Sequence, residues 1–127
     1  MKKRILCIGV MVLLLIVLVL PMYSFQFSRG EIDIRISNKV DSDIIVWFSD
    51  NVTDKYTVSA DTQMTIPYKI ENVTSIALVI ERSGSDAKKI MVEEYVEPLY
   101  RGYADVIIES NAENDIITFF VDSHISN

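Results

Sequence analysis

Two patterns of hydrophobic positions divide the chain near residue 25. Residues 5–20 carry no charged or strongly polar side chain, and a basic cluster at 2–4 precedes them. From Glu31 onward, apolar and polar positions alternate in short runs separated by polar breaks. The first pattern is typical of a hydrophobic helix and the second of β-strands. We therefore expect an N-terminal membrane anchor or signal peptide over 1–25, a short linker over 26–30 and one domain over 31–127.

The strand pattern is clearest at the start of this domain. In residues 31–37, isoleucines at 32, 34 and 36 face one way and polar side chains the other, which predicts a half-buried strand. Similar runs recur about every ten residues, and no convincing helical pattern follows residue 25. We expect seven or eight strands, at 31–37, 43–49, 55–59, 62–70, 75–81, 87–96, 103–110 and 115–122.

Details of these runs refine the expected architecture. Pro67 lacks a ladder donor, so its strand should lie at a sheet edge or contain a bulge. Residues 43–49 are apolar on both faces, and we expect Trp47 to lie between two sheets. Many short strands of this spacing predict an all-β fold, an antiparallel β-sandwich of Greek-key type, with a small barrel as the alternative. In architecture the pattern resembles the immunoglobulin-like or transthyretin-like class, although the domain has no disulfide pair.

The N-terminal segment is long enough to cross a bilayer. A helix over residues 5–23 rises roughly 28 Å, against a hydrocarbon core of ~30 Å. The basic cluster at 2–4 should stay in the cytoplasm, which places the C-terminal domain outside the cell membrane. Signal peptidase requires small residues soon after the apolar run, yet the pair available there is Met22 and Ser24. We expect an uncleaved single-pass anchor, with a cleaved signal peptide and a secreted protein as the alternative.

Charge and cysteine content narrow the function classes. The formal net charge is -6, and it is more negative without the basic cluster at 2–4. An acidic domain argues against nonspecific binding to nucleic acid. The one cysteine, Cys7, lies in the apolar run, so the domain has no disulfide, thiol nucleophile or cysteine metal site. We expect no cofactor.

Candidate catalytic residues are few. His124 is the one histidine, and Asp122, Ser123 and His124 are consecutive, so on a strand they point to alternate faces and cannot form a triad. The chain contains no motif of a nucleophile elbow, a zinc-binding helix or a phosphate loop. We expect a protein that is not an enzyme, with a hydrolase that uses carboxylates alone as a minor alternative.

Acidic and amide residues gather in the expected turns. Such loops hold Ca²⁺ when several meet at one end of a sandwich, because this ion takes six to eight oxygen ligands. Asp and Asn also favour turns for their backbone hydrogen bonds, and on that ground we expect no metal site. The residues concerned are Asp41, Asp43, Asp50, Asp54, Asn111, Glu113 and Asp115.

A tyrosine-rich stretch at 93–103 is the most unusual part of the domain. Tyrosine and arginine are favoured at the centres of protein interfaces. We expect the residues in contact with a partner to include Tyr95, Tyr100, Arg101 and Tyr103. The alternative is that these aromatic side chains face the core at two strand ends.

The tripeptide Asn-Val-Thr occurs twice, at 51–53 and 72–74. In a host with N-glycosylation, Asn51 and Asn72 are acceptor sites. Together these features predict a non-enzymatic, membrane-anchored extracytoplasmic domain that acts in binding, adhesion or as an accessory of an envelope assembly. Its expected partners are the membrane, through residues 5–23, and another envelope protein. The alternative is a secreted module that binds a small ligand, a glycan or calcium.

Overall fold

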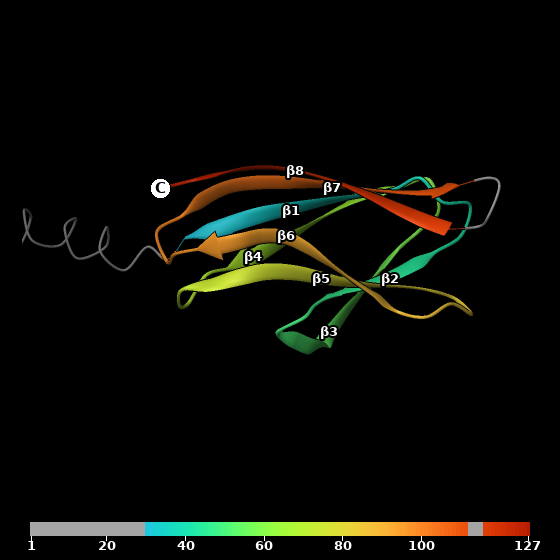
Figure 1. The fold of residues 1–127 in the computed structure, drawn as a ribbon, viewed down its shortest axis with the longest axis horizontal. Helices are drawn as coiled ribbons and strands as arrows, with labels where there is room; N and C mark the ends of the chain where they lie inside the picture. The colour runs from blue at the N-terminus through green and yellow to red at the C-terminus, as the bar shows by residue number, and fades with distance from the viewer. Residues whose placement is uncertain (1–29, 112–115) are drawn as a thin grey trace, which may run out of the picture.

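The structure is a computed structural model that describes residues 30–111 and 116–127 (Figure 1). Within these residues all regular structure is β, and no helix is both long and apolar enough to span a bilayer. The expected anchor over 5–23, Glu113 and Asp115 lie outside the described residues. The strands are β1 (Glu31–Asn38), β2 (Ile44–Phe48), β3 (Asn51–Val58), β4 (Gln63–Lys69), β5 (Thr74–Arg82), β6 (Lys88–Val96), β7 (Arg101–Asn111) and β8 (Ile116–Ser126).

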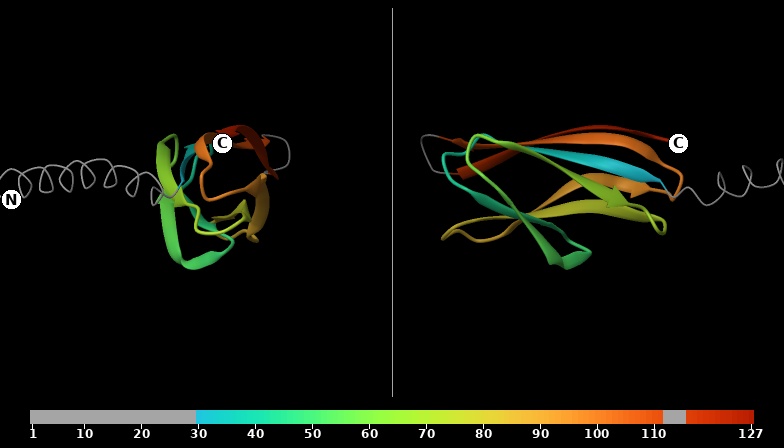
Figure 2. Two further views of the ribbon diagram at one scale, coloured as in Figure 1. Left: turned by 90° about the vertical axis from the view of Figure 1, so that its left-hand side faces the viewer. Right: turned by 180° about the vertical axis from the view of Figure 1, so that it is seen from behind.

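The strands form two four-stranded sheets that face each other across a common interior (Figure 2). Sheet A has the order β4-β1-β7-β8 and sheet B the order β3-β2-β5-β6. All neighbours are antiparallel except β1 and β7, which are parallel. The predicted all-β sandwich is thereby confirmed, but the expectation of antiparallel pairing throughout is wrong for sheet A, where the first and seventh strands run parallel.

The core follows from the alternation read in the sequence. Ile32, Ile34 and Ile36 of β1 are fully buried, and they meet the inward side chains of both sheets. Burying each isoleucine stabilises the fold by about 2 kcal/mol relative to leaving it exposed. Gly84 lies in the turn between β5 and β6, and its φ of 80° is a conformation that glycine adopts without strain.

Pro67, which has no backbone N–H to donate, lies at the edge of a sheet. It belongs to β4, an edge strand of sheet A whose one hydrogen-bonded neighbour is β1. The predicted edge position is confirmed. The pairing of β5 with β6 is irregular near Glu93, because the register shifts twice around the Ile76–Glu93 pair.

Two expectations for β2 and β3 were wrong. Trp47 is only 9% exposed, yet it is not part of the core between the sheets, which takes Val46 and Phe48 from the same strand. Trp47 therefore points to the outer face of sheet B, where the Lys55 ammonium lies 4.2 Å from its ring centroid. The polar residues 51–54, expected to be a break, form the first half of β3, because backbone pairing at a sheet edge requires no buried side chain.

The sandwich has two distinct ends (Figure 1). The Gly30 end contains Gly30, the β4–β5 loop (70–73), the β6–β7 loop (97–100) and the C-terminus. The far end contains the β1–β2 loop (39–43), the β3–β4 loop (59–62) and the β5–β6 turn (83–87). Gly102, expected in a loop, instead belongs to β7.

Candidate functional site

The outer face of sheet A carries a cluster of polar and aromatic side chains. We call it the sheet A outer cluster; its members are Arg35, Tyr103, Asp105, Asp122 and His124. Parallel pairing places Arg35 of β1 directly beside Asp105 of β7. Arg35 Nη2 donates a hydrogen bond to Asp105 Oδ2 at 3.0 Å, and Arg35 Nε lies 2.7 Å from Oδ1 in an ion pair without hydrogen-bond geometry. It also lies over the Tyr103 ring, with Cζ 3.6 Å from the centroid. Arg35 is thus fixed by an ion pair that includes one hydrogen bond and by a cation–π contact.

The cluster continues onto β8. Tyr103 pairs in register with His124, and their ring centroids lie 4.9 Å apart. His124 Nε2 in turn lies 3.2 Å from Asp122 Oδ2. Ser123 points to the opposite face, where its hydroxyl donates to Glu93 at 2.6 Å. Asp122, Ser123 and His124 therefore do not form a triad, which agrees with the prediction from their consecutive positions.

An apolar extension borders the cluster. Phe120 of β8 is 63% exposed, and its register partner on β7 is the half-buried Ile107. A sheet face with a fixed arginine, two aromatic rings and an exposed phenylalanine can take part in stacking, ionic and apolar contacts at once. These are the contacts that dominate the centres of protein interfaces.

The four predicted contact residues do not form one surface. Tyr95 and Tyr100 meet edge-to-face at the Gly30 end, with centroids 6.2 Å apart. The Tyr95 hydroxyl donates to Glu97, and this bond raises the pKa of Tyr95. Tyr103 belongs instead to the sheet A outer cluster, and Arg101 is exposed at the start of β7.

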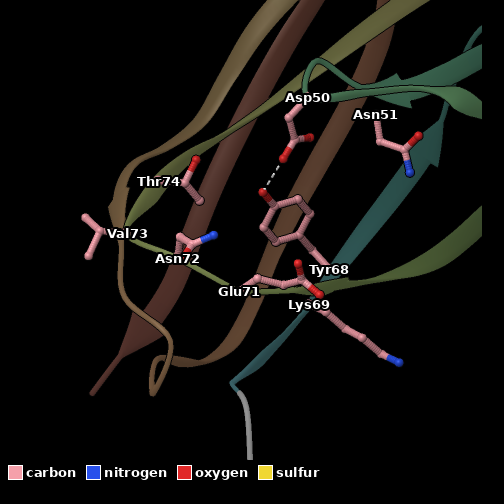
Figure 3. A pocket seen from close by; sticks show the side chains of 8 residues that line it. All are labelled: Asp50, Asn51, Tyr68, Lys69, Glu71, Asn72, Val73 and Thr74. Atoms are coloured by element: carbon pink, nitrogen blue, oxygen red, sulfur yellow. Dashed lines mark hydrogen bonds between the residues drawn. The ribbon is translucent and has the colours of Figure 1, made fainter.

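A polar pocket of about 450 Å³ opens between the β2–β3 turn and the β4–β5 loop (Figure 3). In it, the Tyr68 hydroxyl donates to Asp50 Oδ2 at 2.6 Å. Burial, the hydrogen bond and the negative charge of Asp50 together raise the pKa of Tyr68. The lining consists of Asp50, Asn51, Tyr68, Lys69, Glu71, Asn72, Val73 and Thr74. Both asparagines of the Asn-Val-Thr tripeptides therefore line one pocket.

The turn carboxylates have local hydrogen-bonding roles. Asp43 Oδ1 accepts a hydrogen bond from the Ala60 amide at 3.0 Å, and Asp41 pairs with Arg82 at 3.1 Å. Asp50 and Asp54 lie on the β2–β3 side, away from Asp41 and Asp43. Among residues 30–111 and 116–127, no three acidic or histidine side chains are grouped to hold a metal ion.

Sequence reasoning missed Arg35 and Asp105. Each occupies an outward position of an alternating strand, which looks the same as any solvated polar residue. Their pairing depends on the parallel register of β1 and β7, whose residues are 70 positions apart. A pattern along one strand contains no information on that register.

Comparison with known proteins gives no relative. No protein-family model, no curated protein and no solved structure matches this chain.

Proposed function

We propose that this protein is a non-enzymatic, membrane-anchored extracytoplasmic domain that binds another envelope protein through the sheet A outer cluster. One observation carries the proposal: Arg35, Tyr103 and His124 form a solvent-facing row in which Arg35 is already fixed. A side chain ordered before binding loses less conformational entropy when the partner arrives. The acidic domain suits a partner with a basic surface.

The anchoring part of the proposal comes from the apolar run at 5–23 and the basic cluster before it.

The strand order distinguishes between the two expected classes of sandwich. In a constant-type immunoglobulin domain the first two strands pair within one sheet, whereas β1 and β2 lie in opposite sheets. The transthyretin-like class is therefore the one we propose.

The test is site-specific photocrosslinking in the native envelope. A photoreactive phenylalanine analogue replaces Phe120, beside the cluster, in the full-length chain. The matched control carries it at Met91, an exposed apolar position on the outer face of sheet B. We expect one adduct of defined mass from position 120 and none from position 91. The same adducts from both positions, or none from position 120, would contradict the proposal.

A second variant separates the two candidate contact surfaces. In the chain with the probe at position 120, Tyr103→Ala should lower the adduct yield at least about tenfold, as loss of an interface hot spot does. The variant Tyr95→Ala should leave the yield unchanged, because Tyr95 lies at the Gly30 end. The reverse result would move the contact surface to Tyr95 and Tyr100.

The pocket favours a second candidate function, the binding of a small polar ligand such as a glycan. Its lining offers amide, hydroxyl, carboxylate and ammonium groups around the fixed Tyr68–Asp50 pair. A ligand that binds the native state must raise the melting temperature. A panel of monosaccharides and Ca²⁺ that leaves the melting temperature unmoved would count against this candidate.

A further inference from the structure

The chain enters the sandwich through a tightly held residue. The Gly30 amide donates to the Pro98 carbonyl, and the Gly30 carbonyl accepts from the Ile70 amide at 3.1 Å. Gly30 is thus fastened to both the β6–β7 loop and the β4–β5 loop. An added Cβ would lie 2.7 Å from the Pro98 oxygen and still closer to the Tyr100 oxygen, so no side chain fits. The position of residue 30 consequently fixes the position of this end of the domain.

The chain before Gly30 is short. If residues 5–23 span the membrane, six residues connect the span to Gly30. Six residues reach at most about 20 Å when fully extended. The Gly30 end must therefore lie within that distance of the bilayer surface.

The loops at this end expose apolar side chains. Val73 of the β4–β5 loop is 60% exposed and Leu99 of the β6–β7 loop is 59% exposed, and Tyr95 is exposed beside them. The far-end loops differ: none of the large exposed apolar side chains of the described residues lies at 39–43, 59–62 or 83–87. Among the end loops of the described residues, the large exposed apolar side chains therefore lie at the end that the chain itself brings to the membrane.

The charges flanking these loops are mixed. The basic residues Lys69 and Arg101 are balanced by the acidic residues Glu71 and Glu97. Attraction to anionic lipid therefore does not drive the contact with the membrane. The contact is driven by burial of valine, leucine and tyrosine side chains at the headgroup boundary. A neutral phosphatidylcholine surface is sufficient.

We propose that the Gly30 end of the sandwich rests on the bilayer, with Val73, Leu99 and Tyr95 in the headgroup region. This inference relies on the anchoring part of the proposed function. The occupant of the surface is the lipid of the membrane that holds the same chain. The long axis of the sandwich then stands away from the membrane, and the far end is presented outward.

The test uses the full-length chain in phosphatidylcholine vesicles that contain a headgroup-linked nitroxide quencher. Cys7→Ser removes the native cysteine, and Leu99→Cys introduces a site for a fluorescent label. The matched control places the label by Ser85→Cys in the β5–β6 turn. The eleven residues of β7 span roughly 35 Å between the two ends, beyond the reach of contact quenching. We expect several-fold quenching at position 99 and none at position 85.

Two further readouts separate the possible failures. A protein that stays in the vesicles after a carbonate wash, with equal fluorescence at both positions, overturns this inference and leaves the anchor in place. A protein released by the wash overturns both the anchor and this inference. Replacing half of the lipid with phosphatidylserine should not change the quenching at position 99, and a strong increase would contradict the apolar contact we propose.

Discussion

At the far end of the sandwich one buried side chain, Asn38, holds the loops together, whereas at the Gly30 end the loops meet because residue 30 has no side chain. Asn38 is 1% exposed. Its Nδ2 donates to the carbonyls of Ser42, Val58 and Ser59 at 2.9–3.1 Å, and its Oδ1 accepts from the Val40 amide at 2.9 Å. A buried polar group is tolerated there because every one of its donors and acceptors has a partner.

The comparison shows two solutions to the same problem. Loops at the end of a sandwich carry backbone groups that the sheets do not pair, and these groups must find partners. One end satisfies them with a side-chain amide and the other with direct backbone contact at Gly30. The two ends are therefore sensitive to opposite kinds of substitution. Removing side-chain atoms from Asn38 destabilises the far end, and adding side-chain atoms to Gly30 destabilises the Gly30 end.

The largest effect is expected from Asn38→Ala. It removes four hydrogen bonds and leaves the buried Val40 amide without its acceptor, which costs about 3 kcal/mol of unfolding free energy. Urea denaturation of the detergent-solubilised full-length protein measures this loss. Asn72→Ala, at an exposed position of the Gly30 end, should change the unfolding free energy by less than about 0.5 kcal/mol. Equal losses in the two variants would show that Asn38 does not hold the far end.

Gly30→Ala should have the second largest effect and lower the unfolding free energy by about 2 kcal/mol. The new Cβ collides with backbone oxygens that cannot rotate away. The same denaturation measures it. Gly84→Asn serves as the control: nothing lies within 4 Å of an added Cβ there, and asparagine tolerates a positive φ. A Gly30→Ala protein as stable as the control would mean that the β6–β7 loop moves freely.

Tyr68→Phe should cost about 1 kcal/mol at neutral pH through loss of the hydrogen bond to Asp50. The pKa of Tyr68 is raised in the folded state, so its stabilising contribution is complete below pH 10 and is lost as the pH rises above 10. The difference in unfolding free energy between the wild type and Tyr68→Phe should therefore shrink at alkaline pH. A difference that stays constant from pH 8 to pH 11.5 would contradict a raised pKa.

The smallest effect concerns the exposed rim of the far end. Asp43→Ala removes the acceptor of the Ala60 amide and should cost about 0.5–1 kcal/mol, because water can replace an exposed bond. Asp43→Asn keeps an acceptor oxygen and should restore most of this loss. Matched thermal melts of the two variants make the comparison. Equal melting temperatures for Asp43→Ala and the wild type would exclude a role for this bond.

The sequence predicted strands wherever one face of the strand is buried. The isoleucines of β1 and the edge position of Pro67 follow directly from alternation and from the missing amide of proline. The first half of β3 was missed because both of its faces are exposed, so burial left no signal. Trp47 was assigned to the wrong face because β2 is apolar at every position, and periodicity cannot then tell the core side from the outer side.

The candidate site was less predictable than the fold. Tyr103 was singled out for its residue type, but its partners Arg35 and His124 come from strands at opposite sides of β7. Asn38 follows the expected first strand and gave no signal of its own, because its partners Val58 and Ser59 lie about twenty residues further along the chain. Contacts of this kind depend on the register between strands, which local propensity does not determine.

The parallel pairing of β1 with β7 sets the order in which this protein can be assembled. β1 is the first strand of the domain, and seven of its residues take their parallel partners from Gly102 to Ile108. Sheet A therefore cannot close until β7 has left the ribosome, and contacts of such high sequence separation form slowly. Until then β1 has one edge unpaired and exposed to aggregation. A nascent domain of this topology therefore has an exposed strand edge during its synthesis until β7 pairs with β1.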